Sequence, residues 1–201
     1  MKKRNIWERA LGLYGRLVLS TVLGIFMWIS VSIITTALMP DGTTLTLWNN
    51  LAMNVIALII QGFLFGTIVL SYAWQLGDKD GAKDMFKNRV GDAHFGLKMS
   101  LVAAIPSLTA WALLLADRAF ALFQSYSLLY RVFNGALYPI IVWTMGFTLG
   151  KPLSTVPWVG VILSILPTLI TVAIAWVGYW VGYKQIPLMK KIMYKNKDLR
   201  K

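Results

Sequence analysis

The stretch LVLSTVLGIFMWISVSIITTALMP, residues 17–40, contains no charged side chain. It begins after Arg16 and ends at Pro40 and Asp41, which together give a turn signal. A transmembrane helix needs about 20 consecutive, mostly apolar residues to cross the hydrocarbon core of a bilayer. The stretch is long enough to do so, and we predict a first membrane span near residues 17–38.

Three further apolar stretches have the same character. They predict spans near residues 51–75, 99–116 and 158–182, separated by charged or turn-forming residues. Pro106 and Pro167 lie inside the third and fourth spans, where we expect each proline to kink its helix. The sequence thus predicts an all-α fold, a polytopic membrane helix bundle. We expect one integral membrane domain with four transmembrane helices and additional interfacial helices.

Composition supports this class and excludes several others. Of the 201 residues, 57% are hydrophobic and 14% are charged, whereas an average soluble domain has roughly 25% charged residues. The absence of cysteine excludes disulfides, thiolate metal sites and cysteine nucleophiles. The chain has one histidine, His94, which is too few for a histidine metal site. We therefore expect no metal, no cofactor and no catalytic residues, and no motif predicts an enzyme.

The net charge of +12 indicates an anionic partner, either nucleic acid or an anionic membrane surface. The distribution of the charges favours the membrane, because they stand at the ends of the apolar stretches and form no basic face of their own. We therefore expect contact with the anionic lipids of a bilayer and no binding of nucleic acid.

The positive-inside rule decides between four and five spans. Four spans place seventeen Lys and Arg residues on one side and three on the other, namely Arg118, Arg131 and Lys151. Five spans give eleven against nine. We therefore predict a four-span protein of the cell membrane with both termini cytoplasmic. Its basic cytoplasmic tail covers 184–201, and its external segment covers 117–157.

The segment 132–150 keeps more than one interpretation open, because it is uncharged and long enough to cross a membrane. However, Pro139 and the glycines Gly135 and Gly146 argue against a regular span. With four spans, the external segment is a helix on the outer surface followed by a re-entrant or broken apolar piece. Such a piece is tolerated only where protein or a watery cavity covers it. A fifth span is the alternative.

Two pairs of glycines have the GxxxG spacing inside predicted spans. Gly62 and Gly66 form the first pair, and Gly178 and Gly182 form the second. Small residues let two helix backbones approach closely. Packing within the bundle is the favoured interpretation of both pairs, and dimerisation is the alternative.

The polar residues inside the predicted spans are uncharged. Asn54 and Gln61 are seven positions apart on one face of the second span. They are interpreted as hydrogen-bonding contacts between helices or, alternatively, as part of a polar path. Ionisable residues inside spans mark ion and proton paths, and none of the four predicted spans has one. Asp117 and Arg118 end the third span, and we expect them to pair with each other or with Arg131 at the interface.

Basic amphipathic segments flank the spans. Residues 2–14 predict an interfacial helix that leads into the first span. Residues 78–98 predict a charged, solvated loop, whose acidic residues lack the spacing of a calcium site. In the tail, lysines surround an apolar stripe and form either a contact surface for lipid or a protein partner or a simple topological anchor: Lys190, Lys191, Lys195 and Lys197.

Short motifs mark the second half of the chain: Phe95-Gly96-Leu97-Lys98, Ala104-Ile105-Pro106, Leu129-Tyr130-Arg131 with Asn134, Tyr138-Pro139-Ile140, Gly178-Tyr179 and Gly182-Tyr183-Lys184. In this pattern, over roughly residues 70–200, the chain resembles a group of small integral membrane proteins of low-GC Gram-positive bacteria. The resemblance implies four spans with a large external segment. It implies no activity.

Two functional hypotheses follow. The first is a non-enzymatic membrane component that acts as a partner subunit or assembles with itself, because it has GxxxG pairs and basic amphipathic ends. The alternative is a small transporter or channel with a polar path between the spans, in which Asn54 and Gln61 take part.

Overall fold

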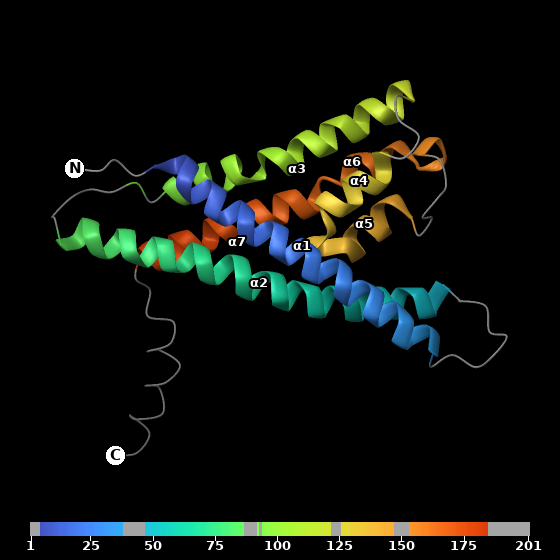
Figure 1. The fold of residues 1–201 in the computed structure, drawn as a ribbon, viewed down its shortest axis with the longest axis horizontal. Coiled ribbons are helices and arrows are strands. Elements are labelled where there is room, and N and C mark those ends of the chain that lie inside the picture. Colours follow the sequence, from blue (N-terminus) through green and yellow to red (C-terminus); the bar gives the residue numbers. More distant parts are fainter. Residues whose placement is uncertain are drawn as a thin grey trace, which may run out of the picture.

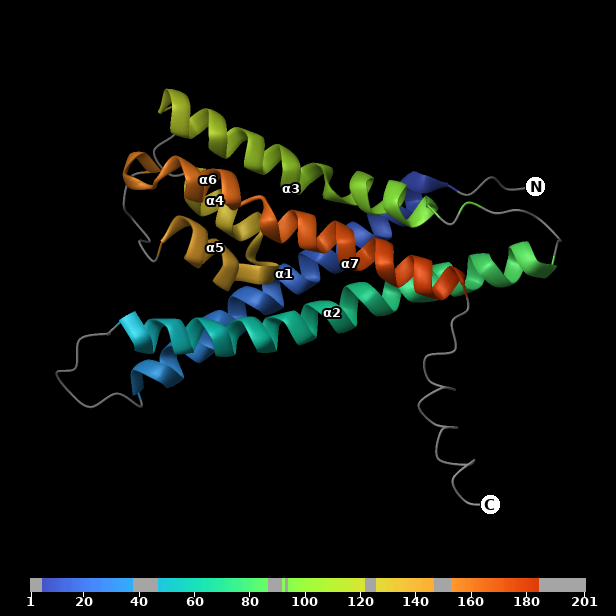
Figure 2. The same ribbon diagram turned by 180° about the vertical axis from the view of Figure 1, so that it is seen from behind.

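The computed structural model describes residues 5–37, 47–86, 92, 94–121, 126–146 and 153–184, and in this part of the chain every regular element is a helix. Three long helices come first: α1 (Ile6–Ala37), α2 (Leu47–Phe86) and α3 (Phe95–Phe120). A fourth long element near the end of the chain consists of α6 (Trp158–Leu163) and α7 (Leu166–Tyr183). Figures 1 and 2 show these elements running lengthwise through the molecule.

These four elements are long and apolar enough to cross a membrane, over Ile6–Ile34, Leu51–Phe86, Phe95–Phe120 and Trp158–Tyr183. The predicted all-α class with four membrane-spanning helices is confirmed, and the chain is a multi-pass membrane protein. Many large apolar side chains point outwards from the bundle, as expected where lipid and not water surrounds a helix. The first three helices extend beyond their predicted spans, because flanking charged residues continue each helix, whereas the fourth element matches its predicted span to within one residue.

The two ends of the bundle differ in what they contain. One end, on the left of Figure 1, holds the start of α1, the ends of α2 and α7 and the start of α3. We call it the basic end. The other end holds the end of α1, the start of α2, the end of α3 and the short helices that follow α3. We call it the hairpin end.

The second helix is longer than predicted at the basic end. It continues to Phe86, so the expected loop at 78–98 is wrong for its first part. The helix continues because this part is packed against α7 and its acidic residue Asp80 is buried and paired. Charge alone had indicated a solvated loop.

The first helix begins at Ile6 and is continuous with the first span. The predicted interfacial helix at 2–14 is therefore the first turns of α1, in so far as its residues are described. Ala10 and Leu13 are buried in the core at the basic end, whereas Trp7 and Leu11 face outwards. This part of the chain is packed in the bundle because α1 contacts both α2 and α3.

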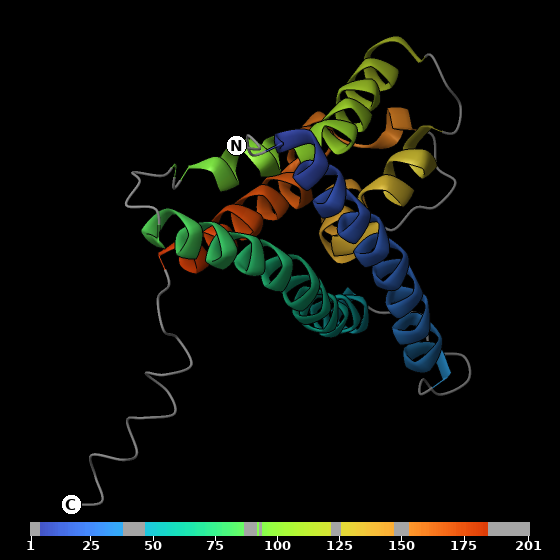
Figure 3. The same cartoon turned by 60° about the vertical axis from the view of Figure 1, so that its left-hand side comes forward.

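Residues 126–145 form a helical hairpin. It consists of α4 (Tyr126–Phe133), the single turn η1 (Gly135–Leu137) and α5 (Tyr138–Met145). Its apolar part is shorter than a membrane-spanning helix. Figure 3 shows the hairpin between α1 and the α6–α7 element. The chain thus enters the bundle and turns back, which is one of the two forms expected for this segment.

The hairpin packs against the long helices with one of its sides. Its tip meets the middle of α1, where a Cβ atom built on Gly24 would lie 2.6 Å from the carbonyl oxygen of Gly135. In α4, Tyr130 and Arg131 are buried against α3 and α1, whereas Leu129, Val132 and Phe133 are exposed. The expectation that this part is a helix on the outer surface stays a prediction.

The fourth long element is broken near its middle. A turn at residues 164–165 separates α6 from α7, and Pro167 follows it. Proline lacks an N–H group, so it leaves a backbone carbonyl of the preceding turn without its usual donor. At the break, the indole Nε1 of Trp111 donates to the carbonyl of Val161 at 3.2 Å, and the Tyr130 hydroxyl donates to the carbonyl of Ser164. Side chains of α3 and α4 thus donate hydrogen bonds to two backbone carbonyls at the break.

Candidate functional site

Gln61 connects the hairpin to two of the long helices through hydrogen bonds. Its side chain is buried in α2, and its Nε2 atom donates to the carbonyl of Gly24 in α1 at 2.7 Å. Its Oε1 atom accepts a hydrogen bond from the backbone N–H of Tyr138 at 3.1 Å. One amide therefore joins α1, α2 and the first residue of α5. Asn54 lies on the same helix and is also fully buried.

These hydrogen bonds do not support the role in a polar path that was one prediction for Gln61. Both ends of its amide bond backbone groups, so Gln61 serves as a contact between helices, the other predicted interpretation. Neither Gln61 nor Asn54 lines the cavity between the hairpin and the long helices. The hydrogen bonds of Gln61 favour a contact between helices, and a polar path that includes Asn54 stays a prediction.

A small cavity lies instead between the hairpin and three long helices, and its lining surface is more apolar than polar. Its volume is about 20 Å³, which is enough for a molecule the size of water. It is bounded by α1, α3, the hairpin and α7. Five of its lining residues carry a hydroxyl or an amide: Thr21, Ser107, Asn134, Thr168 and Thr171. No charged side chain lines it among the described residues.

Asn134, at the hairpin tip, connects this cavity to the broken helix. Its Oδ1 atom accepts a hydrogen bond from the Thr168 hydroxyl at 3.0 Å, and both side chains are buried. Thr168 follows Pro167 at the start of α7, so the contact joins the tip of the hairpin to the break. The two irregular parts of the backbone therefore meet at the cavity.

The glycines of α7 lie where α2 and α7 cross. A Cβ atom on Gly182 would overlap the carbonyl oxygen of Trp74, and one on Gly178 would lie 3.0 Å from the carbonyl oxygen of Leu70. The sequence analysis did not single out Gly77 and Gly81 of α2. A Cβ atom on either would overlap a carbonyl oxygen of α7. Two GxxxG pairs thus face each other and let the helix backbones touch.

The other predicted pair behaves differently. A Cβ atom on Gly62 or Gly66 would meet nothing within 4 Å. The favoured interpretation, packing within the bundle, is therefore wrong for this pair in the described part of the chain. Its spacing matches that of the α7 pair, but it lies on a part of α2 that no other helix covers.

The basic end contains a buried ion pair that sequence reasoning missed. Asp80 of α2 is 1% exposed. Both of its carboxylate oxygens accept hydrogen bonds from the Arg9 guanidinium, at 2.9 Å for Oδ1, and Oδ2 also accepts one from the Tyr179 hydroxyl at 2.8 Å. Arg9 also lies over the ring of Phe95, with 5.3 Å from Cζ to the ring centre. One carboxylate thus connects α1, α2 and α7.

Asp92 lies at the same end, just before α3. It accepts a hydrogen bond from the Lys98 ammonium at 2.7 Å and another from the backbone N–H of His94 at 2.9 Å. The bond from Lys98 holds the pKa of the Asp92 carboxyl below its ordinary value. The predicted contact residues of the tail, Lys190, Lys191, Lys195 and Lys197, lie outside the described residues.

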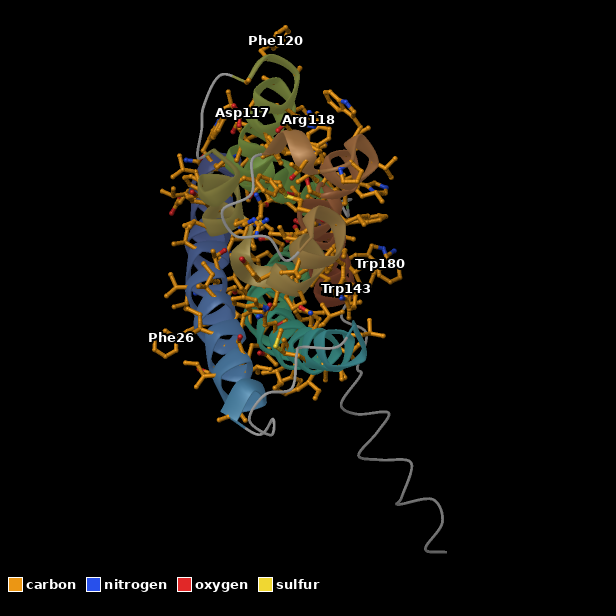
Figure 4. All side chains as sticks on the ribbon, turned by 90° about the vertical axis from the view of Figure 1, so that its right-hand side faces the viewer. Phe26, Asp117, Arg118, Phe120, Trp143 and Trp180 are labelled. Carbon is orange, nitrogen blue, oxygen red and sulfur yellow. The ribbon has the colours of Figure 1, made fainter. Side chains whose placement is uncertain are left out.

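Charged residues also gather at the hairpin end. Figure 4 shows Asp117 and Arg118 near the end of α3, below Phe120. Arg118 lies over the ring of Trp158 at 5.0 Å, and Asp117 and Arg131 are buried. The sequence predicted that Asp117, Arg118 and Arg131 form an ion-paired group at the interface. However, the Nε and Nη1 atoms of Arg131 have no hydrogen-bond acceptor in the described part of the chain.

The fold and these sites define the class: a polytopic α-helical membrane protein in which four long helices enclose a helical hairpin. No family model, no curated protein and no solved structure matches the chain. Within the described residues, no group of three His, Cys, Asp or Glu residues is placed to hold a metal ion.

Proposed function

We propose that the protein is a non-enzymatic small transporter or channel that binds a small polar solute or ion between the hairpin and the broken helix. The observation that carries this proposal is the meeting of two irregular backbone segments at a cavity that five polar side chains help to line. Irregular backbone inside a membrane bundle is tolerated where it is covered by protein or lines a cavity. Membrane transporters form their binding sites from broken helices of this kind.

The chemistry of the cavity favours a small, uncharged or singly charged solute. Its polar groups are hydroxyls and an amide, and the Thr168–Asn134 hydrogen bond holds two of them in place. Hydroxyl and amide oxygens accept hydrogen bonds or coordinate small cations without a fixed negative charge. The volume of about 20 Å³ corresponds to a closed state. Movement of the hairpin against α7 is the step that we expect to open it.

Flux into proteoliposomes tests this function. Stopped-flow light scattering after mixing with KCl, glycerol or sucrose measures water and solute entry. We expect the protein to raise entry of a small solute, and Ser107→Leu, which fills the cavity, to abolish the increase. Thr168→Val removes the contact to Asn134 and is expected to change the rate, whereas Thr67→Val, on the exposed face of α2, is the matched control. Entry equal to that of empty liposomes for every probe would refute the proposal.

We further propose that the basic end faces the cytoplasm of a cell membrane, with both termini inside. The support is the count of seventeen Lys and Arg residues on that side against three on the other. Anionic headgroups of the cytoplasmic leaflet attract such basic segments. In this orientation the hairpin enters the bundle from outside.

Self-association, or association with a partner subunit, is the second candidate. One observation favours it: Gly62 and Gly66 have the spacing of a helix–helix contact, yet a Cβ atom on either would meet nothing within 4 Å in the described part of the chain. We expect chemical crosslinking in mild detergent to trap a dimer of the wild type. Gly62→Leu with Gly66→Leu is expected to lose it. The same dimer yield from both proteins would exclude this surface as the contact.

A further inference from the structure

The hairpin end contains a buried cation that has no matching anion among the residues that the structure describes. Arg131 of α4 is 4% exposed. A guanidinium keeps its charge at every physiological pH. Two of its nitrogen atoms, Nε and Nη1, are buried without an acceptor in the part of the chain that the structure describes. A buried charge is strongly destabilising unless it is paired, so an anion has to come from elsewhere.

A second guanidinium lies on the neighbouring helix. Arg118 belongs to α3, which packs directly on α4. Its plane lies over Trp158, and its Nε atom also lacks an acceptor among the described residues. The hairpin end thus offers unused N–H donors from two helices that touch each other.

The charge count leaves an excess of cations at this end. The two segments predicted to lie on this side of the membrane, residues 39–50 and 117–157, contain two acidic residues, Asp41 and Asp117, and three basic residues, Arg118, Arg131 and Lys151. The region therefore keeps a positive charge even if each carboxylate pairs fully with one cation.

We propose that Arg131 and Arg118 bind an anionic oxygen group, a carboxylate or a phosphate, at the hairpin end. The guanidinium fork matches both groups with two parallel hydrogen bonds. Arg131 precedes the cavity residue Asn134 by three positions, and Asn134 lies just after the end of α4. The proposed site is separate from the proposed transport function. A lipid headgroup and a soluble anion would offer it the same chemistry.

The stability of the full chain in two sets of conditions tests this site. The first compares nanodiscs of phosphatidylcholine with nanodiscs that also contain phosphatidylglycerol. The second compares sodium phosphate and sodium acetate with sodium chloride in an uncharged detergent at equal ionic strength. We expect the anion that binds to raise the Tm of the wild type by roughly 5 °C at saturation. A rise with phosphatidylglycerol alone identifies a lipid headgroup, and a rise with phosphate or acetate identifies a soluble anion.

Variants separate the site from general charge effects. Arg131→Met keeps most of the length of the side chain and removes its charge, so it is expected to lose the rise. Lys79→Gln, an exposed residue at the basic end, is expected to keep it. If Arg131→Met does not fold, Arg131→Lys and Arg118→Gln are titrated instead, with an expected loss of affinity of about tenfold. No rise in the wild type, or an equal rise in the Arg131 and Arg118 variants, would overturn the proposal.

Discussion

Asp80 is a carboxylate removed from solvent almost completely, and its hydrogen-bond partners lie on two other helices. The Arg9 guanidinium bonds both of its oxygens, and the Tyr179 hydroxyl adds a further bond. Breaking a buried ion pair by removing one partner typically costs about 3–5 kcal/mol, because the other charge is left alone. This single residue therefore fixes the arrangement of α1, α2 and α7 at the basic end.

Replacing Asp80 with Asn is expected to lower the free energy of unfolding by about 3 kcal/mol, since Arg9 then keeps a partly buried charge without its anion. For a chain of this size we expect the Tm in detergent to fall by roughly 10 °C. Asp78→Asn is the matched control, because Asp78 is exposed on the same helix. It is expected to change the stability by less than about 0.5 kcal/mol. Equal Tm values for the two variants would contradict the structural role of Asp80.

Gln61 provides the second prediction at this scale. Gln61→Leu leaves the carbonyl of Gly24 and the N–H of Tyr138 without their side-chain partner. Each unsatisfied buried group costs about 1–3 kcal/mol, so the hairpin tip is expected to loosen. Hydrogen exchange measures this directly, and we expect faster exchange across residues 135–138. Gln75→Leu, at an exposed position of α2, is expected to leave that exchange unchanged.

The sequence predicted that Asn54 and Gln61 are interior polar residues, but not what Gln61 bonds. Gln61 accepts a hydrogen bond from the backbone N–H of Tyr138, which is 77 positions away in the sequence. Tyr138 belongs to a segment whose path was open between two interpretations. Asp80 was missed for the same reason. Its partners are 71 and 99 positions away, and its neighbours in the sequence are charged residues typical of a solvated loop.

At the scale of elements, the contact of α2 with α7 is a crossing made by glycines from both helices. Gly182→Ala would push a methyl group into the carbonyl oxygen of Trp74, and a backbone atom cannot turn away as a side chain can. Overpacking of this kind costs about 1–3 kcal/mol, which exceeds the gain of up to about 1 kcal/mol from the better helix propensity of alanine. The variant is expected to be less stable than the wild type in a thermal melt.

Gly62→Ala is the matched control for that prediction. The same methyl group meets nothing within 4 Å at this position, so only the gain in helix propensity remains. We therefore expect the thermal melt of Gly62→Ala to occur at or slightly above that of the wild type. Destabilisation of both variants to the same degree would contradict the assignment of the crossing to the α7 pair.

The spans could be predicted closely because charged residues bound them in the sequence. The glycine pairs could not be told apart, because Gly62–Gly66 and Gly178–Gly182 have the same spacing in equally apolar surroundings. Only the direction in which each face points distinguishes them, and this depends on how the helices assemble. The break at residues 164–165 was expected in part, as a kink at Pro167.

For the whole molecule, the central feature is the hairpin held inside four long helices. A bundle that merely anchored its termini would not need a segment that enters and turns back. The hairpin brings Asn134 to the broken helix and places Arg131 in the interior. The cavity and the guanidinium that has no acceptor among the described residues both result from this one arrangement.

The most direct test of this arrangement is the side of the membrane from which the two flanks of the hairpin can be labelled. The chain has no cysteine, so single cysteines report without background. Phe120→Cys precedes the hairpin, Ser154→Cys follows it, and Lys79→Cys marks the basic end, all at exposed positions. A membrane-impermeant maleimide applied to intact cells is expected to label Cys variants at 120 and 154 alike and not the variant at 79. Labelling of 120 and 154 from opposite sides would show that the segment crosses the membrane and would contradict the hairpin.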